Sequence, residues 1–390
     1  MERGTILKVS PDFRRREIVS TGIRFAVGMA FNRRGDLFVT DQEGATWRPD
    51  GNPLDELLHI QPGRHYGFPA RHPRHLPGVV DEPSVFDYGP QHQSTCGLAF
   101  NDPVNAGPVF GSPDWAGEAI VAGYSRGKLW RTRLAKTEAG YVAQTHLLAT
   151  VQALTVDACV SPRGDLVVAT HGGQPDWGTG PGGKGRLWQV RRTPGETPLP
   201  VAAWNPDPGT LRVAFDRPVD PEWARGLAAR ARIESGQFVY PGDRFETIRP
   251  GYQIVYDQLA APRHRHEILS ARLSPHRRTL SLQTRPRPLA VNHVVTLPAR
   301  PVRADGPEEE LDLLSTLHGV EVRGEGWSEW LPHLDLAVAR EFTRGSAEHE
   351  ALFQRLAQPG RVVFRGALDL WQMLQPAIQP GSAIDWERPP

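Results

Sequence analysis

One short pattern constrains the fold more than any other feature, because it occurs twice, at 27–41 (VGMAFNRRGDLFVTD) and at 156–170 (VDACVSPRGDLVVAT). In register, Gly35 and Asp36 align with Gly164 and Asp165. An apolar segment, a polar turn ending in Gly-Asp and a second segment of alternating apolar residues predict a β-hairpin. The sequence therefore predicts the same hairpin at two places in the chain.

A looser third copy lies between these two, with strands expected at 97–100 and 119–122. The intervals exceed the ~40–50 residues of common propeller blades, so we expect blades with long loops. One outer strand is expected after each hairpin, at 57–61, 128–134 and 186–191. We predict about three blades over 1–192. Because three blades cannot close a ring, we expect a second chain or missing blades to cover the open edge. The segment Thr5–Val9 is expected to be the outer strand of an incomplete preceding blade.

The rest of the chain changes character after a Pro-rich stretch at 193–205. The 39 Gly and 37 Pro in 390 residues exclude long helices and indicate a mainly β chain of two or three domains. An Ig-like β-sandwich is predicted over 193–324, and a C-terminal α/β extension over 325–390. Short strands are expected at 211–215, 253–256, 268–273, 279–282 and 293–297. Helices are expected at 335–342 and 347–357.

Net charge, cysteine content and hydropathy limit the binding partners, the disulfide state and the location that we expect. A net charge of +1 gives no overall field for nucleic acid or an anionic membrane. Cys96 and Cys159 permit one disulfide or none, and because each lies in an apolar strand we expect buried, unreactive thiols. No stretch approaches ~18 uninterrupted apolar residues and no signal peptide core is visible, so we expect no membrane span and, as written, no export.

Titratable residues concentrate between positions 41 and 96. Loops on a rigid scaffold are where function gathers, so these side chains are candidates for substrate contacts. Histidines there are candidate metal ligands, acid-base groups or structural hydrogen-bond partners, and their spacing matches no local metal motif. The candidates are Asp41, Glu43, Asp55, Glu56, Arg64, His65 and His92.

Five motifs then follow one another in the order seen in quinoprotein glucose and sorbosone dehydrogenases: Ser20–Arg24, Gly28–Phe31, Gly35–Leu37, Leu54–Leu57 and Gly63–Pro69. The resemblance covers about residues 5 to 191. It implies a six-bladed type of propeller that uses pyrroloquinoline quinone (PQQ) and calcium. The sequence of the loops at 55–96 resembles most closely a bacterial group of propellers that are often fused to a cytochrome c domain. The members of that group look periplasmic or secreted.

The resemblance also implies roles for particular residues. Cofactor contacts are expected from Arg24, Arg126, Asp157 and Tyr66, and calcium contacts from the carbonyls of Gly44 and Ala45. Asp55 and Glu56 match an acidic pair of the family, and a loop brace is the alternative interpretation of that pair.

The departures from the family are equally specific. Ser125, Leu154 and Val156 stand where the family carries cations that meet the quinone carboxylates. Burying such charge without partners costs several kcal/mol per ion, so PQQ binding is expected to be weak. The family's catalytic histidine belongs to a blade that has no counterpart among the predicted ones.

Three functions stay open. The first is a quinoprotein sugar or alcohol dehydrogenase, incomplete or degraded, that relies on an external electron acceptor because the chain has no CxxCH haem motif. The second is a non-catalytic propeller module that binds carbohydrate or protein. Its candidate stacking aromatics are Trp47, Tyr66, Phe68, Tyr88 and Trp177. The third is a calcium-dependent lactonase. Its candidate ligands are Asp41, Glu43, Asn52 and Asp157.

Overall fold

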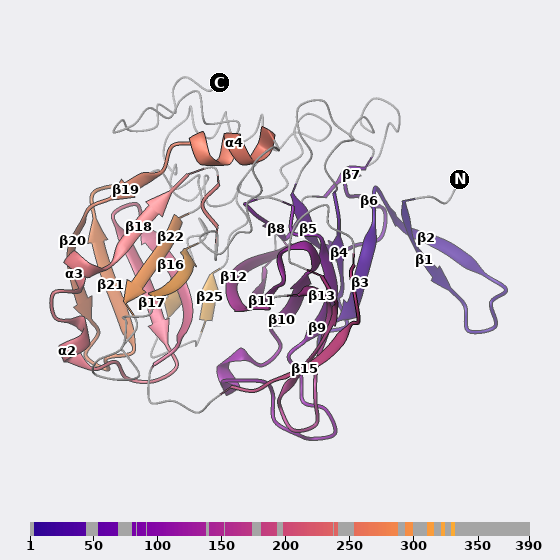
Figure 1. The fold of residues 1–390 in the computed structure, drawn as a ribbon, viewed down its shortest axis with the longest axis horizontal. Coiled ribbons are helices and arrows are strands. Elements are labelled where there is room, and N and C mark those ends of the chain that lie inside the picture. The colour runs from indigo at the N-terminus through magenta and orange to yellow at the C-terminus, as the bar shows by residue number, and fades with distance from the viewer. Residues whose placement is uncertain are drawn as a thin grey trace.

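The chain is mainly β, with a few short helices, in the computed structural model (Figure 1). The structure describes residues 4–43, 54–68, 80–82, 84–90, 92–137, 140–151, 153–173, 181–192, 198–236, 238–240, 253–287, 293–298, 310–315, 321–323 and 329–331. Three antiparallel sheets lie on one side of Figure 1 and a pair of sheets on the other. No helix within the described residues has the length and apolar character needed to cross a membrane.

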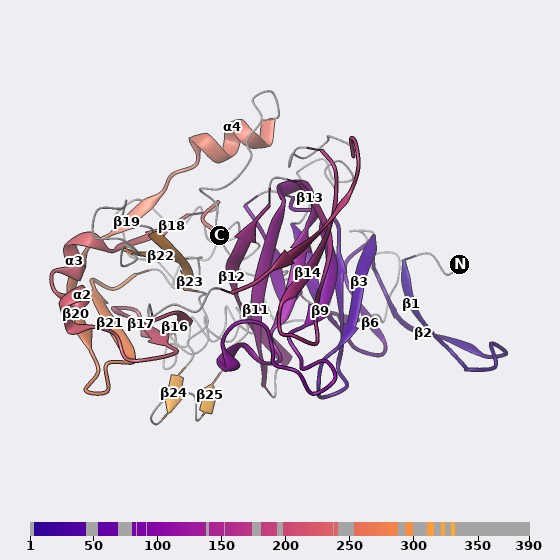
Figure 2. The ribbon, with the colours of Figure 1, turned by 60° about the horizontal axis from the view of Figure 1, so that its bottom comes forward.

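The three sheets follow one another along the chain and pack face to face (Figure 2). The first has the order β3-β4-β5-β8, with strands Ala26–Phe31, Leu37–Asp41, Asp55–Ile60 and Phe86–Tyr88. The second has the order β12-β11-β10-β9, with strands Gly140–Thr150, Lys128–Thr137, Ala119–Gly123 and Thr95–Phe100. The third has the order β13-β14-β15, with strands Leu154–Val160, Leu166–His171 and Arg186–Val190. All three predicted hairpins and their outer strands are confirmed; β8 and β12 are additional.

The two copies of the repeated pattern form the same turn. In the first, Asn32 Oδ1 accepts from the N–H groups of Arg34 (2.9 Å) and Asp36 (3.0 Å). In the second, Ser161 Oγ accepts from the N–H groups two and four residues later, each at 3.2 Å. The glycine before each aspartate has a positive φ, 81° at Gly35 and 78° at Gly164. The sequence repeat is therefore a structural repeat.

Glycines set the distance between neighbouring sheets. A Cβ on Gly28 of β3 would lie 2.4 Å from the carbonyl oxygen of Cys96 in β9. A Cβ on Gly97 would lie 2.5 Å from the Cα of Asp157 in β13. Because only glycine permits these approaches, the strands β3, β9 and β13 pack backbone to backbone. The copy at 156–170 has Asp157 at the register position of Gly28, and this side chain is exposed.

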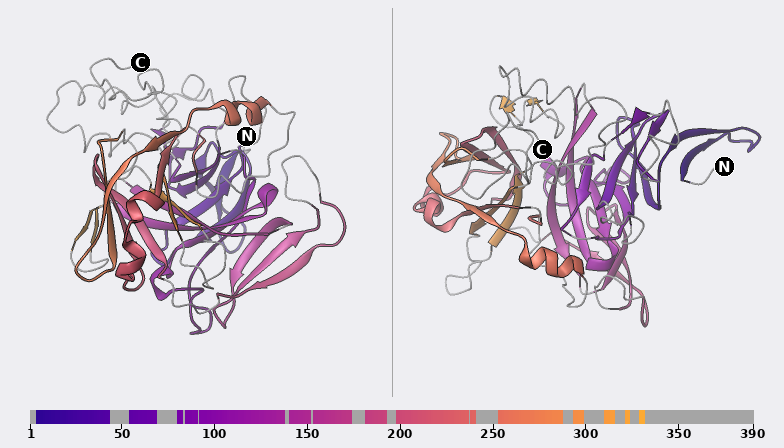
Figure 3. Two further views of the ribbon diagram at one scale, coloured as in Figure 1. Left: turned by 60° about the vertical axis from the view of Figure 1, so that its left-hand side comes forward. Right: turned by 90° about the horizontal axis from the view of Figure 1, so that it is seen from above.

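The N-terminal strands form a hairpin at the edge of a fourth sheet, and the assignment of Thr5–Val9 to an incomplete preceding blade stays a prediction. β1 (Thr5–Val9) pairs with β2 (Arg16–Thr21), and this hairpin projects from the body of the molecule (Figure 3, right). The same sheet continues through β6 (Arg64–His65) and β7 (Val80–Asp81). Ile6, Ile23 and Tyr66 cover part of the first sheet on the side away from the second sheet. Large apolar side chains nevertheless stay exposed on β3 and beside it, at Phe25, Val27, Met29 and Phe31.

The second region consists of two four-stranded sheets, β16-β17-β21-β20 and β19-β18-β22-β23. Their strands are Pro200–Asp207, Thr210–Phe215, Thr279–Thr284 and Ile268–Leu273, and then His264–His266, Arg232–Ser235, His293–Pro298 and Glu310–Ser315. One apolar core joins both sheets, with Leu211 and Leu282 from the first and Ile233 and Val295 from the second. The short helices α2 (Pro221–Ala224) and α3 (Leu227–Arg230) lie between β17 and β18 in the chain.

One sequence expectation fails in this region. Residues 253–256 are not a strand but the start of helix α4 (Gln253–Ala260), whose apolar Val255 and Leu259 are four residues apart, as in a helix. The Pro-rich stretch at 193–205 also contains the start of a strand that was not predicted, because β16 begins at Pro200. This strand lies at a sheet edge, where a residue without an N–H is tolerated.

The two regions are joined through β12 of the second sheet. The backbone N–H of Ala203 donates to Gln144 Oε1 (3.0 Å), and Gln144 Nε2 donates to the carbonyl of Ala203. A ribbon of β24 (Glu321–Arg323) and β25 (Glu329–Leu331) spans the predicted boundary at 324. The helices predicted at 335–342 and 347–357 lie outside the described residues.

Candidate functional site

The three sheets bring most of the candidate residues to one end, here called the loop end. It contains the start of β3 and the end of β4, where Ala26 pairs with Asp41. Gln42 Nε2 donates to the Thr95 carbonyl at the start of β9 (3.0 Å). Thr155 Oγ1, at the start of β13, donates to the Gly123 carbonyl at the end of β10 (2.7 Å). The opposite end, with the Gly-Asp turns, is here called the turn end.

Asp41 holds the start of β3 at the loop end. Its carboxylate accepts from the backbone N–H groups of Arg24 (2.9 Å) and Phe25 (2.6 Å). Burial raises the pKa of Asp41 to about 6, although these two donors lower it and the charge of Asp55 raises it further. The Arg24 guanidinium donates to the Gln42 carbonyl (2.7 Å). Arg24 and Asp41 therefore order the backbone around the entry to β3.

Asp55 ties three loop segments together. Its carboxylate accepts from the N–H groups of Glu43 (2.8 Å) and Ser94 (2.6 Å), and His92 Nδ1 lies 3.7 Å away. Burial would raise the pKa of Asp55, but the neighbouring His92 imidazole and the two backbone donors outweigh it and lower the pKa below its usual value. These contacts are the kind that the loop-brace interpretation of Asp55 requires.

The buried part of the loop end is rich in acids. Four acidic residues here are at most 1% exposed: Asp41, Glu43, Asp55 and Glu56. Buried cations among the described residues here are Arg126 (4% exposed) and Lys128 (0% exposed). Among the described buried residues of the loop end, carboxyl groups therefore outnumber cationic groups.

Arg64, His65 and Tyr66 belong to a different place. They lie on β6 and just after it, and His65 Nδ1 is 2.8 Å from Thr21 Oγ1. Arg64 forms an ion pair with Glu82 (3.4 Å).

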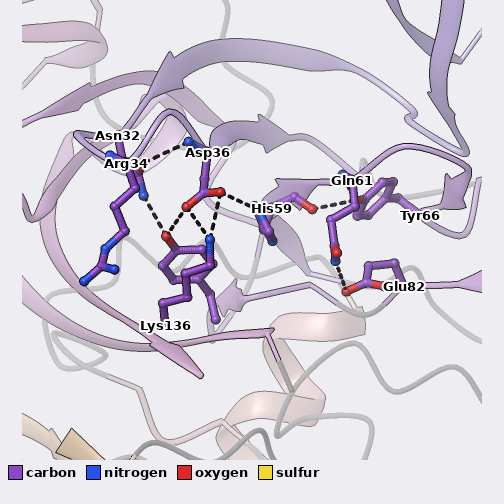
Figure 4. A network of polar contacts seen from close by, with 9 residues as sticks. Asn32, Arg34, Asp36, His59, Gln61, Tyr66, Glu82 and Lys136 are labelled. Carbon is purple, nitrogen blue, oxygen red and sulfur yellow. Dashed lines mark hydrogen bonds and ion pairs between the residues drawn. The ribbon is translucent and has the colours of Figure 1, made fainter. Parts of the chain in front are cut away.

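The Tyr66 hydroxyl reaches toward the turn end (Figure 4). It donates to the His59 carbonyl and accepts from the Gln61 N–H (2.9 Å). Burial raises its pKa above the usual value. Tyr66 and Tyr88 are each 1% exposed, so neither ring is available to stack on a sugar.

The positions that matter most for the quinone resemblance lie near the starts of β9, β11 and β13. Ser125 Oγ donates to Ser94 Oγ (3.1 Å), and Leu154 is completely buried. Asp157 is exposed, and its carboxylate accepts from the N–H of Ala158 (2.9 Å). Other predicted residues, namely Gly44, Ala45, Trp47, Asn52 and Trp177, lie outside the described residues.

A cavity of about 470 Å³ opens at the loop end of the third sheet. The residues that line it are Ala153, Thr170, His171, Gly172, Gly173, Gly182, Gly183, Lys184, Arg186 and Trp188. Trp188 Nε1 donates to Thr170 Oγ1 (2.9 Å), and the Arg186 guanidinium lies 5.5 Å from the Trp188 ring. His171 Nδ1 is 3.1 Å from the Tyr124 hydroxyl.

The sequence analysis missed this cavity. A signal was present, because Thr170 and His171 occupy the register positions of Asp41 and Gln42, and Asp41 was already a candidate.

The cysteines differ from the expectation of two buried thiols. Both are free, and only Cys96 is buried; Cys159 is exposed, because its side of the third sheet has no sheet packed on it among the described residues. Burial raises the pKa of Cys96 to about 12, and the charge of Asp55 raises it further. No group of three or more His, Cys, Asp or Glu side chains suited to a metal ion is found in the described part of the chain.

The solved structures that are similar to this chain include two sugar dehydrogenases. A putative oxidoreductase (glucose dehydrogenase) from Thermus thermophilus shares 23% identity, with 48% of this chain and 55% of that chain covered at a TM-score of 0.35. The PQQ-bound aldose sugar dehydrogenase from Streptomyces coelicolor shares 20% identity, with 48% and 51% covered at the same TM-score. The chain thus spans about half the length of these proteins. Neither a protein-family model nor a curated protein matches the sequence.

The described residues do not fit a bound PQQ at the position that the resemblance implies. PQQ carries three carboxylates, and such groups need paired cations when they are buried. Leu154 offers none, and the Ser125 hydroxyl donates to Ser94. The Arg24 guanidinium contacts a backbone carbonyl, so among the expected contacts that the structure describes, Arg126 is the one buried cation for three carboxylates. The neighbouring buried carboxyl groups add like charge, which disfavours a polyanion further.

Proposed function

We propose that this chain is a propeller protein of the quinoprotein sugar-dehydrogenase type that binds a carbohydrate or related alcohol without anchoring PQQ. Residues 1–192 are proposed to be a three-blade part of a six-bladed type of propeller. An Ig-like sandwich at 193–324 and an extension at 325–390 complete the proposal. The order of sequence motifs and the three consecutive antiparallel sheets support it.

One observation carries the functional part: the buried loop end is acidic where a quinone would bring three negative charges. Asp41 and Asp55 use their oxygens on backbone N–H groups, so they act in ordering loops rather than in binding a cation. A neutral polyhydroxylated molecule does not suffer the repulsion that a polyanion would meet here.

The cavity beside Trp188 is the proposed carbohydrate site. It joins an aromatic ring to the polar groups of His171, Lys184 and Arg186, and small pockets of this kind use few polar groups to fix a ligand's orientation. Two cationic side chains favour a sugar that carries one carboxylate, such as a uronate.

The quinone part is tested by titrating the purified chain with PQQ and calcium and following the quinone absorption band. We expect no saturable change at micromolar cofactor. A bound quinone at that concentration, together with oxidation of a sugar in the presence of an artificial electron acceptor, would show that the chain is a dehydrogenase.

The carbohydrate part is tested separately by calorimetric titration with glucose and glucuronate. We expect measurable binding that is tighter for glucuronate and is weakened roughly tenfold by Lys184→Gln or Trp188→Leu. Leu187→Ala is the matched control on the same strand, because Leu187 is 76% exposed and does not line the cavity. Absence of binding by either sugar would remove the carbohydrate proposal and leave the quinone result untouched.

A protein partner is a second candidate, favoured by the exposed apolar side chains of β3. Met29 and Phe31 are 53% and 65% exposed, whereas the residues at their register positions in the copy at 156–170, Ala158 and Val160, are buried against the second sheet. We infer that a second copy of the chain covers this face. Analytical ultracentrifugation should detect self-association that Met29→Lys abolishes; a monomer at every concentration would contradict the inference.

A further inference from the structure

We propose that a cleft at the turn end of the third sheet binds a phosphate or sulfate ester. The cleft has a volume of about 560 Å³ and is formed by four separate segments. These are the loop after β9, the turn between β13 and β14, the residues directly after β15, and the loop after β17 in the sandwich, which carries Arg217. Its lining residues are Pro108, Val109, Gly111, Arg163, Gly164, Asp165, Arg191, Arg192 and Arg217. It lies at the opposite end of the sheets from the proposed carbohydrate cavity.

Among the described residues around the cleft, cations outnumber acids. Arg191 contacts Asp165 through two hydrogen bonds of 3.1 and 3.3 Å, and Gln189 Nε2 also donates to this carboxylate (2.5 Å). These donors hold the pKa of Asp165 below its usual value, so it stays ionised and occupied. One of the arginines is therefore matched by one carboxylate.

The second carboxylate is shared by two arginines. Arg192 and Arg217 lie 3.5 and 3.3 Å from Asp216 Oδ2, and the Leu199 N–H donates to Asp216 Oδ1 (2.8 Å). The Arg163 charge acts on Asp165 and helps to lower the pKa of that carboxyl. Among the described residues around the cleft, four guanidinium groups therefore outnumber two carboxylates, and this favours an anionic ligand.

The turn that lines the cleft is closely packed. Gly164 has φ 78°, and a Cβ there would meet Pro108 Cγ at 2.8 Å, so the β13–β14 turn packs closely on the neighbouring loop. The Arg192 guanidinium lies 5.4 Å from the ring of Trp115, which is 6% exposed. Guanidinium forks suit the oxygens of phosphate and sulfate, and the volume leaves room for the organic group that carries them. The cleft is therefore suited to an ester rather than only to a bare ion.

The site is tested by calorimetric titration of the full chain with glucose 6-phosphate, glucose 6-sulfate, inorganic phosphate and glucose. We expect both esters to bind, inorganic phosphate to bind more weakly, and glucose to leave this site empty. Arg163→Gln and Arg217→Gln should each weaken ester binding roughly tenfold. The matched control is Arg15→Gln on the N-terminal hairpin, an exposed arginine far along the chain from the cleft.

Two readouts keep the outcome clear. Thermal melting of each variant without ligand shows that it is folded. Lys184→Gln separates the two sites, because it removes ester binding at the loop-end cavity and should leave ester binding at this cleft unchanged. The proposal is overturned if neither ester binds, if Arg15→Gln weakens binding as much as Arg163→Gln does, or if Lys184→Gln abolishes it. If only one ester binds, that result identifies which of the two anions the cleft accepts.

Discussion

The two copies of the repeated hairpin have the same turn and different surroundings. In the first copy, Asp36 accepts from Tyr141 (2.5 Å) and pairs with Lys136 (2.9 Å), both on the second sheet (Figure 4). In the third sheet, Asp165 pairs with Arg191, which follows the last strand of the same sheet. The turn residue is the same, but one aspartate joins two sheets and the other stays within its own. Local sequence thus determines the turn, and the position in the stack determines what the turn contacts.

The loop end shows the same contrast. Asp41 of the first copy holds two backbone N–H groups, whereas Thr170, at the same register position, accepts from Trp188 at the edge of a cavity. Later segments of the chain enclose the loop end of the first copy, because Asp55 binds the N–H groups of Glu43 and Ser94 there. The loop end of the copy at 156–170 borders a cavity instead.

The largest expected effect tests how closely the sheets pack. Gly28→Ala should lower the free energy of unfolding by roughly 3 to 5 kcal/mol, because the new Cβ would lie 2.4 Å from a backbone oxygen. Asp157→Ala, at the same register position of the copy at 156–170, should change the free energy of unfolding by less than about 0.5 kcal/mol. Urea denaturation measures both.

A folding control for Gly28→Ala is Gly35→Ala, where no atom lies within 4 Å of the new Cβ and only the positive φ opposes the change. We expect a loss of about 1 kcal/mol there. Equal losses at Gly28 and Asp157 would show that the first and third sheets are packed alike.

The next effect concerns the pH dependence of stability at the loop end. The pKa of Asp41 rises from 3.8 to about 6 on folding, so its contribution is fully present below about pH 4 and is lost as the pH rises through 6. Between pH 4 and 7, wild type should therefore lose up to about 3 kcal/mol relative to Asp41→Asn. Urea denaturation at several pH values measures this difference.

Asp55→Asn is the control for that experiment. The pKa of Asp55 is lowered on folding, so its contribution is present at neutral pH and is lost only as the pH falls below its usual titration range. Wild type should show no decline relative to Asp55→Asn between pH 4 and 7. A parallel decline in both comparisons would mean that Asp41 is not the group responsible.

A smaller effect distinguishes the two turn aspartates. Asp36→Ala removes the acceptor of the buried Tyr141 hydroxyl and should cost about 1 to 2 kcal/mol. Asp165→Ala should cost less, because its partner Arg191 is 64% exposed and solvent screens the pair. Thermal unfolding of both variants measures the order, and a larger loss for Asp165→Ala would contradict the comparison.

Much of the fold could be predicted because local pattern determines it. Alternating apolar residues and Gly-Asp turns located the hairpins of the first and third sheets, and the looser copy located that of the second. The failures have physical causes. In the 253–256 segment, alternation and helical spacing compete over a short stretch, and the chain adopts the helix. β16 was missed because proline excludes interior strands but not an edge strand, and edge position is a tertiary property.

The candidate site was harder to predict. The region of high charge density in the sequence places five of its candidates at the loop end: Asp41, Glu43, Asp55, Glu56 and His92. The charge density could not distinguish these residues from Arg64 and His65, which lie elsewhere. His65 contacts Thr21 of β2, and Arg64 pairs with Glu82. The cavity at Trp188 and the arginine cleft each combine residues from distant segments, so no local window of sequence contains them.

The last prediction concerns the two cysteines and leaves stability unchanged. A maleimide reagent should modify Cys159 in the native chain and spare Cys96, because Cys159 is exposed whereas Cys96 is 7% exposed and burial raises its pKa to about 12. Both should react in urea, and mass spectrometry of the two peptides measures the ratio. Repeating the reaction at rising protein concentration tests whether the third sheet also takes part in self-association, since a covered face would slow the labelling of Cys159. Modification of Cys96 at the same rate as Cys159 in the native chain would contradict the packing of β9 between the first and third sheets.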